Sequence, residues 1–325
     1  MTPPLLLSHW PTPLDRAPRL AAALGLGPDD LWVKRDDLTD LGGGNKVRKL
    51  EHLVAEALAA DATVLVASGG AQSNHARMTA AAAARVGLRA VLVLGGTALV
   101  GRPGNLALDE LLGAEIVLAD GLSGVQLDDR VGEVADRLRA QGEVLAVLPF
   151  GGSSAVGARG YVACAAELEE QAPDAAHVVV AVGSGGTMAG LVAGLGHERV
   201  LGIDTGATND PVERVAAIVT ELGGRADRLR LDRDQVGDGY GRLTPAAASA
   251  MRTAARTEGL LLDPVYTGKA LAGLAAAAAE GIVRPGERTV FVHTGGLPGL
   301  FGHPYAAELA AVAVGEGRRW TIPAT

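Results

Sequence analysis

The sequence predicts an α/β protein with helices on both faces of a mainly parallel, doubly wound sheet. Two observations carry this prediction. Short, nearly continuous apolar runs recur along the 325 residues, and alanine-rich stretches of helical length lie between them. Such runs are typical of parallel strands buried on both faces, and their alternation with helices indicates βαβ units. At about 150 residues per domain, this length predicts two domains or one large unit.

The expected elements follow this alternation along the chain. The expected strands are residues 63–67, 90–94, 115–118, 144–147, 178–182, 200–203 and 289–292. The expected helices are residues 47–59, 74–86, 127–140 and 155–171, and the alanine run 275–279 should lie in a further, tightly packed helix. Glycine-rich stretches at 42–44 and 151–157 are the best candidates for domain crossings. They predict a smaller inserted α/β domain of residues 50–157 and a larger domain of residues 1–49 and 158–325.

Composition and charge exclude several classes of protein. The net charge of −8 argues against nucleic acid or an anionic membrane as a partner. A single cysteine, Cys164, rules out a disulfide framework and a cysteine-rich metal site, and no metal is expected. No apolar run approaches the ~20 residues that span a bilayer. The first ten residues lack the basic start of a signal peptide, so we expect a cytoplasmic protein.

Lysine is rare in this chain. Lys34, Lys46, Lys49 and Lys269 are the only four among 29 basic residues. Arginine replaces lysine wherever a plain positive charge is enough, but it cannot replace a titratable amine nucleophile. Each lysine is therefore a better functional candidate than usual, although drift alone would explain any one of them.

The first glycine-rich stretch, residues 42–44, leads directly into Asn45 and Lys46. Glycines let the backbone approach a ligand closely, and Lys46 stands at an expected helix start, where the macrodipole disfavours its protonated form. A neutral amine is a competent nucleophile for a carbonyl carbon. Lys49 lies one helical turn further and could share that face. The plain alternative is a glycine turn followed by solvated lysines.

The second stretch, residues 68–77, follows a strand and opens a helix. Ser73 or Asn74 is a natural N-cap, and the free backbone N–H groups of that helix start could hold a carboxylate. Capping alone explains one of these residues but not the run that continues to His75. A lone histidine is more often structural than catalytic.

The third stretch is a phosphate-binding candidate. Gly183, Ser184, Gly185, Gly186 and Thr187 follow an expected strand and open a helix, which together make an anion cup. No lysine follows, so this is not a Walker loop. The dinucleotide fingerprint lacks its third glycine, at Met188. Asp204 stands at about the right distance for a ribose ligand, so a dinucleotide-binding oxidoreductase remains a remote alternative.

Two of the four tyrosines, Tyr240 and Tyr266, fall in glycine-flanked segments, where each could pack a loop, stack on a cofactor or transfer a proton. Lys269 should open a helix on the surface. Residues 293–296 again follow a strand. Together, one phosphate cup, one amine nucleophile and a ring-facing hydroxyl are what pyridoxal phosphate requires. A non-catalytic binding protein would leave the Asn-Lys pair after three glycines unexplained.

Five motifs now indicate a family. Lys34-Arg35-Asp36-Asp37, GGNKVRKLE, GGAQSNHAR, DPVYTGK and HTGG occur in this order between about residues 14 and 300. In these motifs the chain resembles the pyridoxal-phosphate enzymes of the D-cysteine desulfhydrase and 1-aminocyclopropane-1-carboxylate (ACC) deaminase family. The resemblance implies a two-domain, three-layer α/β fold with open twisted sheets, that of the tryptophan synthase β-subunit and of fold type II. It also implies a homodimer and a small amino-acid substrate.

The resemblance further implies roles for single residues. Lys46 looks like the lysine that binds the cofactor covalently, and Asn74 like the residue that bonds its phenolic oxygen. Ser73, Asn74 and His75 resemble the loop that holds the substrate carboxylate. Gly183, Ser184, Gly185, Gly186 and Thr187 look like the phosphate cup. Tyr240 and Tyr266 resemble two active-site tyrosines, and Thr294 looks like the partner of the ring nitrogen.

Two positions bear on the substrate within the family. ACC deaminases typically carry glutamate at the position of Thr267 and leucine at that of Thr294, so two threonines resemble the desulfhydrase pattern. A neutral threonine leaves the ring nitrogen unprotonated, which suffices when a thiolate leaves. The resulting hypothesis is α,β-elimination of D-cysteine to pyruvate, hydrogen sulfide and ammonia. Lys46 is the simplest Cα base, with Ser73 or Tyr266 as helpers. ACC deamination, cysteate sulfo-lyase activity and broader D-amino-acid β-elimination stay open.

Overall fold

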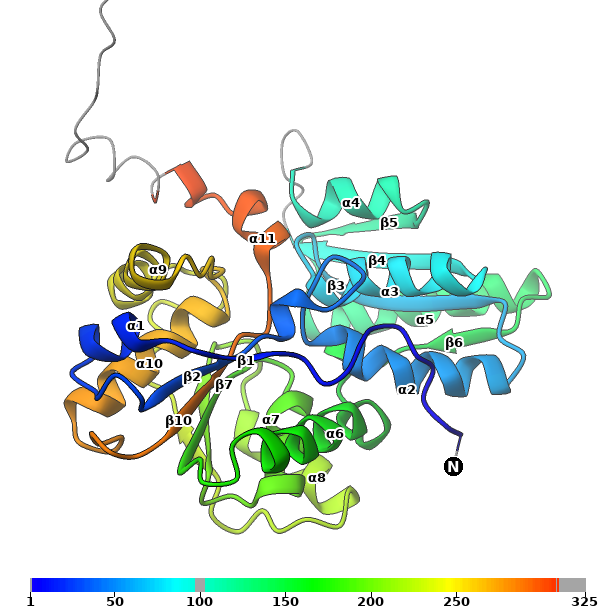
Figure 1. Ribbon diagram of the computed structural model, residues 1–325. Coiled ribbons are helices and arrows are strands. Elements are labelled where there is room, and N and C mark those ends of the chain that lie inside the picture. The colour runs from blue at the N-terminus through cyan, green and yellow to red at the C-terminus, as the bar shows by residue number, and fades with distance from the viewer. Residues whose placement is uncertain (1, 97–102, 308, 310–325) are drawn as a thin grey trace, which may run out of the picture.

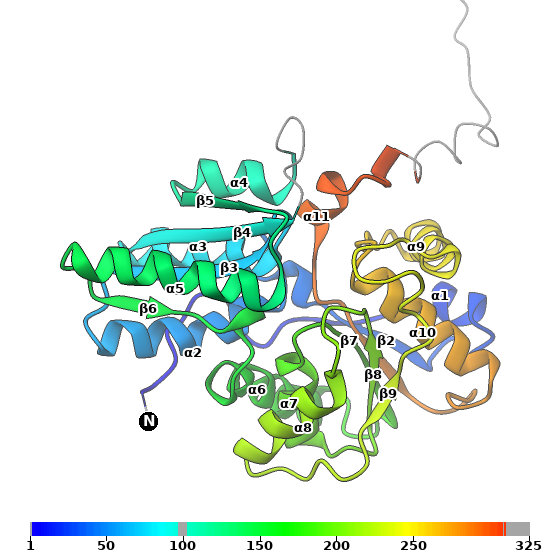
Figure 2. The ribbon, with the colours of Figure 1, turned by 180° about the vertical axis from the view of Figure 1, so that it is seen from behind.

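The computed structural model describes residues 2–96, 103–307 and 309. They form two sheets with helices on both faces of each, as the two opposite views show (Figures 1 and 2). The predicted α/β class is thus confirmed. None of the helices in these ranges combines the length and the hydropathy needed to span a bilayer.

The larger sheet has six strands. Their order is β1 (Leu14–Arg16), β2 (Leu31–Lys34), β10 (Thr289–Val292), β7 (His177–Val182), β8 (Val200–Asp204) and β9 (Arg230–Asp232). All neighbours run parallel except β1, which is antiparallel to β2. Strand β7 lies inside this sheet and all six of its residues are buried, which explains its unbroken apolar run.

Alternate side chains of these strands supply two separate cores. Val178, Val180 and Val182 pack against one group of helices: α6 (Ala155–Gln171), α7 (Gly186–Leu195) and α8 (Pro211–Glu221). Val179 and Ala181 face the other group: α1 (Pro18–Ala23), α9 (Pro245–Glu258) and α10 (Thr267–Ala279). Side chains alternate between the two faces along each strand, so a residue's position in the strand determines which helix layer its side chain contacts.

The smaller sheet has four parallel strands. Their order is β5 (Glu115–Asp120), β4 (Arg89–Gly96), β3 (Val64–Gly70) and β6 (Leu145–Val147). One face is covered by α2 (Lys46–Ala59), α3 (Asn74–Val86) and α4 (Asn105–Leu111). The other face packs on α5 (Gly124–Ala140). Short 3-10 turns at Asp36–Leu38 (η1) and Phe150–Gly152 (η2), and α11 (Leu297–Gly302), complete the described elements.

The expected strands and helices all occur, with ends that differ by at most a few residues. Helices α3 and α6 have the predicted bounds, and the alanine run lies in α10. All four strands of the smaller sheet come from residues 64–147. The predicted boundaries near 50 and 157 fall inside α2 and α6, and the division into two domains stays a prediction.

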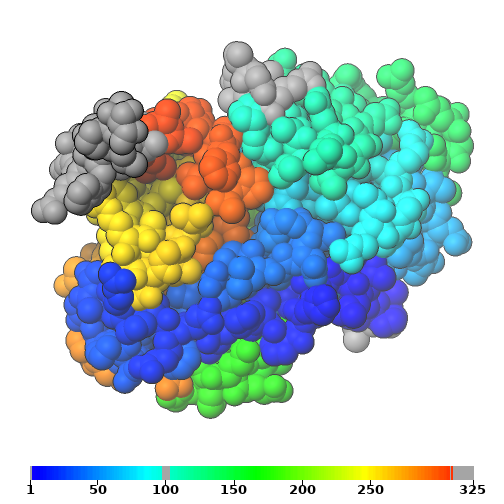
Figure 3. Space-filling view, turned by 45° about the horizontal axis from the view of Figure 1, so that its top comes forward, coloured from blue at the N-terminus to red at the C-terminus, as the bar shows by residue number. Residues whose placement is uncertain are grey.

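The N-terminal segment contacts both sheets. Leu5 N–H donates to the carbonyl of Glu51 in α2, and Leu7 N–H donates to the Glu51 carboxylate at 2.8 Å. Leu7 is itself buried in the core of the smaller sheet. A few residues later β1 joins the larger sheet. Figure 3 shows this blue segment running along one face from the part that carries α9, in yellow, to the part that carries α3 and α4, in cyan.

Candidate active site

A pocket lies where the carboxyl ends of parallel strands from both sheets meet. Strands β3 and β6 reach it from the smaller sheet, and β7, β8 and β10 reach it from the larger one. This edge is where open α/β sheets bind their ligands. With its open mouth the pocket measures about 720 Å³, and its walls include most of the predicted site residues: Lys46, Ser73, Asn74, His75, Gly183, Ser184, Gly185, Thr187, Tyr240, Tyr266 and Thr294.

The glycine loop before Lys46 is packed so tightly that side chains cannot replace its glycines. Gly43 has φ +75°, and a Cβ there would come within 2.2 Å of the Asp37 carbonyl oxygen. Gly44 has φ +122°, and a Cβ there would lie 2.9 Å from the Thr294 carbonyl oxygen. Both φ values favour glycine. The loop can therefore deliver Lys46 to the pocket at the first residue of α2.

The amine of Lys46 has an unusual environment. Its Nζ donates to the Gly151 carbonyl at 3.2 Å. Desolvation lowers the pKa of Lys46 from its ordinary 10.5 to about 8. The direction agrees with the sequence prediction, but the cause is burial rather than the helix dipole. Such an amine has a substantial neutral fraction near pH 8 and can act as a nucleophile.

Lys49 lies beneath the pocket on the same side of α2. Its Nζ donates to the same Gly151 carbonyl at 3.3 Å and to Ser153 Oγ at 3.0 Å. Burial, and then the charge of Lys46, push the pKa of Lys49 well below its ordinary value. The sequence placed both lysines on one face, and the shared carbonyl shows that they lie side by side.

The predicted phosphate cup follows β7 directly. Gly183, Ser184, Gly185 and Thr187 line the pocket. Gly185 has φ +94° and precedes the first residue of α7, Gly186. The first N–H groups of an α-helix have no partner within the helix, and the positive end of its dipole attracts anions. An anion held here would lie in the same pocket as the Lys46 amine.

Two residues that the sequence analysis missed support this cup. Ser153 Oγ accepts the Gly186 N–H at 3.0 Å and lies 2.7 Å from Ser184 Oγ. Asn45 Nδ2 donates to Thr187 Oγ1 at 3.0 Å. Ser153 lies within the glycine-rich stretch 151–157, and Asn45 directly follows the stretch 42–44. The presence of a polar residue in or next to a glycine-rich stretch is the sequence signal by which both could have been identified.

The loop after β3 begins α3 with an N-cap. Ser73 Oγ accepts the N–H of Ala76 at 3.1 Å, so Ser73 rather than Asn74 caps the helix. Ser73, Asn74 and His75 all line the pocket. Burial, reinforced by the nearby lysine amines, holds the pKa of His75 well below its usual range. His75 is therefore a neutral imidazole at physiological pH.

The two predicted tyrosines form a pair. The hydroxyl oxygens of Tyr240 and Tyr266 lie 2.5 Å apart, and the rings meet edge to face with centroids 6.1 Å apart. Burial raises the pKa of Tyr266 well above 10, so its hydroxyl keeps its proton at neutral pH. The Tyr266 ring also packs on Gly183, where a Cβ would lie 3.0 Å from Cε1. The pair thus brings a proton donor to the cup.

The two threonines that bear on substrate choice lie at different depths. Thr294 lines the pocket. Thr267 is fully buried, and its hydroxyl donates to Asp263 Oδ1 at 2.7 Å while it accepts the Asp263 N–H at 2.8 Å. Thr267 is not among the residues that line the pocket. Its hydroxyl is used within the Asp263 turn, and the same carboxylate accepts the backbone N–H of Tyr266 at 2.9 Å.

Lys269 and Asp204 lie outside the pocket, and the expectation for Lys269 differs from the structure. Lys269, expected on the surface, is fully buried, and its Nζ donates to the Val236 carbonyl at 2.8 Å and the Gly239 carbonyl at 3.1 Å. That prediction was wrong, because α10 begins only two residues earlier, at Thr267, and directs Lys269 at the carbonyls of the loop that contains Val236 and Gly239. The Asp204 carboxylate, the candidate ribose ligand, accepts from Gly206 N–H at 2.8 Å.

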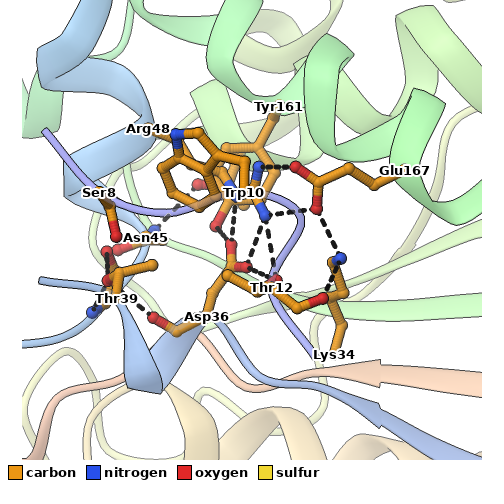
Figure 4. Close-up of polar contacts among 12 residues, drawn as sticks. Ser8, Trp10, Thr12, Lys34, Asp36, Thr39, Asn45, Arg48, Tyr161 and Glu167 are labelled. Atoms are coloured by element: carbon orange, nitrogen blue, oxygen red, sulfur yellow. Dashed lines mark hydrogen bonds and ion pairs between the residues drawn. The ribbon is translucent and has the colours of Figure 1, made fainter. Parts of the chain in front are cut away.

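Behind α2, a buried ion network holds the helix from the side opposite the pocket (Figure 4). Arg48 Nε donates to Asp36 Oδ2 at 2.8 Å, and Arg48 Nη1 donates to Glu167 Oε1 at 2.7 Å. Lys34 Nζ donates to Glu167 Oε2 at 2.5 Å. Trp10 lies over the Arg48 guanidinium at 3.9 Å. Three of these residues, Lys34, Asp36 and Arg48, belong to the sequence motifs, and their role is to fix α2.

Among the described residues, no group of three or more histidine, cysteine or carboxylate side chains is arranged to hold a metal ion. The fold and the pocket instead define a class: an α/β enzyme that binds a phosphorylated small molecule next to a nucleophilic amine.

Comparison with known proteins identifies the family. The family model described as pyridoxal-phosphate dependent enzyme matches residues 5–295. A putative ACC deaminase of Pyrococcus abyssi is 41% identical over 96% of this chain and 96% of its own length. A D-cysteine desulfhydrase of Klebsiella pneumoniae is 41% identical over 93% of this chain and 97% of its own. The chain belongs to the pyridoxal-phosphate-dependent enzyme family.

A solved structure agrees with this assignment. The crystal structure of an ACC deaminase homologue superposes with a TM-score of 0.87 at 37% identity, over 95% of this chain and 96% of that one. The predicted fold, that of the type II pyridoxal-phosphate enzymes, is therefore confirmed.

The residues of the pocket fit this cofactor. Gly151 separates the Lys46 amine from Ser184: a Cβ on Gly151 would lie 3.6 Å from Lys46 Nζ and 2.2 Å from Ser184 Oγ. The absent side chain leaves room between an amine that can bind an aldehyde and a helix start that can bind a phosphate. Lys46 and the 183–187 cup would hold the two ends of the cofactor, and Tyr266 lies against the cup.

Proposed function

We propose that this enzyme eliminates hydrogen sulfide from D-cysteine, with pyruvate and ammonia as the other products. One observation carries the pyridoxal-phosphate chemistry of this proposal. A single pocket brings together an amine of lowered pKa, an anion-binding helix start and a paired tyrosine hydroxyl, at Lys46, residues 183–187 and Tyr240–Tyr266. Bound pyridoxal phosphate supplies an electron-accepting ring that stabilises negative charge at the carbon next to the amino group.

The chain's own residues divide the remaining work. The start of α3, with Ser73, Asn74 and His75, binds the substrate carboxylate through backbone N–H groups and a neutral imidazole. Lys46, once free of the cofactor, removes the Cα proton in its neutral form, because its pKa lies near 8. Tyr266 keeps its proton at neutral pH and can donate it to the departing sulfur. Overall, D-cysteine and water yield pyruvate, ammonia and hydrogen sulfide.

The choice of D-cysteine rests on Thr294 and on the relatives. Thr294 lines the pocket, and a threonine there resembles the desulfhydrase pattern. Several relatives about 40% identical bear the name D-cysteine desulfhydrase. ACC deamination is the second candidate, because other relatives of similar identity bear the name putative ACC deaminase. Cysteate, with a sulfonate leaving group, is a third substrate for the same site.

The deciding experiment measures sulfide and pyruvate release from D-cysteine by the purified, pyridoxal-phosphate-loaded protein. L-cysteine, cysteate and ACC are assayed in parallel. Equal amounts of sulfide and pyruvate from D-cysteine, with little from L-cysteine, would support the proposal and its stereochemistry. A loaded protein that releases no sulfide but forms 2-oxobutyrate and ammonia from ACC would overturn it in favour of deamination.

Lys46→Ala is the control for this assay. It should abolish turnover and the visible absorption that the covalently bound cofactor gives. Activity retained by Lys46→Ala would show that the amine at this position does not carry the reaction.

The setting of the enzyme is part of the proposal. The family resemblance supports a homodimer, a cytoplasmic location and a small amino-acid substrate. The negative net charge of −8 supports the absence of nucleic acid and anionic membrane among its partners. Sedimentation of the loaded protein would test the dimer.

A further inference from the structure

Asn105, at the first residue of α4, is fully buried, and both its amide nitrogen and its amide oxygen are hydrogen-bonded. Its Nδ2 donates to the Gln72 backbone carbonyl at 2.9 Å and to Asn74 Oδ1 at 2.8 Å. Its Oδ1 accepts from Arg77 Nε at 3.2 Å. None of these residues except Asn74 lines the pocket.

Two of these partners fix which way the Asn105 amide faces. A backbone carbonyl can only accept and Arg77 Nε can only donate. A rotated amide would set oxygen against the Gln72 carbonyl and nitrogen against the Arg77 guanidinium. Both contacts would be repulsive in a fully buried site. The NH₂ group of Asn105 must therefore face Asn74.

The fixed orientation of the Asn105 amide also fixes the orientation of the Asn74 amide. Because Asn105 offers a donor, Asn74 must turn its Oδ1 toward Asn105, and its Nδ2 is the arm left for the pocket that Asn74 lines. Asn74 is thus a donor to whatever binds there. The acceptor that suits it is a negatively charged oxygen, such as the ionised phenolic oxygen of the cofactor.

Arg77 ties this amide pair to the loop that carries the nucleophile. Its terminal nitrogens donate to the Leu41 carbonyl and, at 3.4 Å each, to the carbonyls of Gly42 and Gly43. The same guanidinium therefore contacts Asn105 on one side and the loop before Lys46 on the other. One buried side chain therefore positions both the Asn105–Asn74 pair and the loop before Lys46, the two parts that would contact the cofactor.

We propose that Asn105, anchored by Arg77, is a positioning residue that holds the Asn74 amide with its Nδ2 toward the pocket and so keeps the cofactor's phenolic oxygen ionised. This proposal rests on pyridoxal phosphate as the cofactor but not on D-cysteine as the substrate.

The test replaces Asn105 and follows the cofactor rather than the reaction. In Asn105→Asp, a carboxylate faces Asn74, so the Asn74 amide rotates and presents its oxygen to the pocket. We expect the pH midpoint at which the bound cofactor's visible band changes to rise by about one unit, a tenfold change in proton affinity. The dissociation constant of pyridoxal phosphate should rise with it.

A double-variant cycle separates positioning from a structural or long-range effect. With Asn74→Ala as background, Asn105→Asp should cause no further shift, because the residue through which it acts is gone. An equal shift in both backgrounds, or none in either, would overturn the proposal. Failure of D-cysteine turnover in the parent enzyme would overturn the proposed substrate and leave this test intact.

A neutral variant and a matched control complete the design. Asn105→Ser is too short to reach Asn74 and carries no charge, so it frees the Asn74 amide without turning it. It should give a smaller upward shift with the same dependence on Asn74, and it serves if Asn105→Asp does not fold. Gln72→Glu loses the donation from Gln72 Nε2 to the Pro103 carbonyl but keeps the Gln72 backbone carbonyl for Asn105. It should lower the melting temperature without moving the midpoint; a midpoint shift equal to that of Asn105→Ser would assign Asn105 a merely structural role.

Discussion

At the scale of single residues, Lys46 shows how burial prepares an amine for chemistry. Its pKa falls to about 8 through desolvation, while its only polar contact given by the described residues is the Gly151 carbonyl. A carbonyl can bond the amine without neutralising its charge, so the loss of hydration is not repaid by a counter-ion. The Lys46 amine is therefore reactive because its surroundings provide neither full hydration nor a counter-ion that would stabilise its charged form.

This lowered pKa predicts how cofactor uptake depends on pH. Below pH 8 the neutral fraction of Lys46 falls about tenfold per unit. The rate at which the cofactor-free protein binds pyridoxal phosphate should therefore rise with pH up to about 8 and then level off. The control is a blocked free lysine, whose amine has a pKa near 10.4. Uptake that rises in parallel with the free amine above pH 8 would contradict the assignment.

Tyr266→Phe separates the hydroxyl of this residue from its ring. The ring packs on Gly183 and is retained, while the hydroxyl that pairs with Tyr240 is lost. Turnover should fall by roughly 10²- to 10⁴-fold, the usual contribution of a proton donor, with the cofactor still bound. Tyr305→Phe, outside the pocket, should leave turnover unchanged. Loss of cofactor from Tyr266→Phe would indicate a structural role instead.

At the scale of elements, α2 has two faces with different tasks. One begins with Lys46 in the pocket, and the other carries Arg48 into the ion network with Asp36 and Glu167 (Figure 4). Arg48 has almost no exposure, at 2%, and an isolated charge there would be costly. The network therefore determines where α2, and with it the nucleophile, must lie.

Glu167→Gln tests this anchoring role. It leaves Arg48 and Lys34 short of one negative charge in a buried site, and removal of one partner from such a pair costs about 3 kcal/mol. Urea unfolding should show this loss. Glu170→Gln, an exposed position on the same helix, is the matched control and should change stability by less than about 0.5 kcal/mol. Equal stability of the two variants would show that the network does not hold α2.

The elements also show what sequence reasoning can and cannot reach. Apolar runs predicted every long strand, because buried parallel strands need them. Strands β1 and β9 have three residues each, and β2 ends in a buried lysine, so none of them forms such a run. Glycine stretches at strand ends marked the pocket. Asn105 and Ser153 escaped notice because their importance depends on contacts between distant segments.

At the scale of the whole molecule, the pocket depends on both sheets. The smaller sheet provides the loop after β3, and the larger sheet provides the cup after β7. The N-terminal segment contacts both parts (Figure 3). A ligand that contacts both walls should therefore order them together.

Hydrogen exchange can detect this joint ordering. Pyridoxal phosphate should protect the amides of residues 69–76 and of residues 183–188 in the same titration. Inorganic phosphate, which can fill only the cup, should protect residues 183–188 and leave 69–76 unchanged. Protection of 69–76 alone by the cofactor would contradict the placement of the phosphate on α7.

The burial of the lysines has a consequence for handling the protein. Lys34 and Lys269 have no exposed surface and Lys49 has 1%, so amine-selective reagents cannot reach them in the folded state. Apart from the terminal amine, that leaves Lys46 on the pocket wall. Among the lysine side chains, amine-directed cross-linkers and dyes will therefore react only with Lys46 and inactivate the enzyme, and a dye that is mapped to Lys46 reports that the pocket is open.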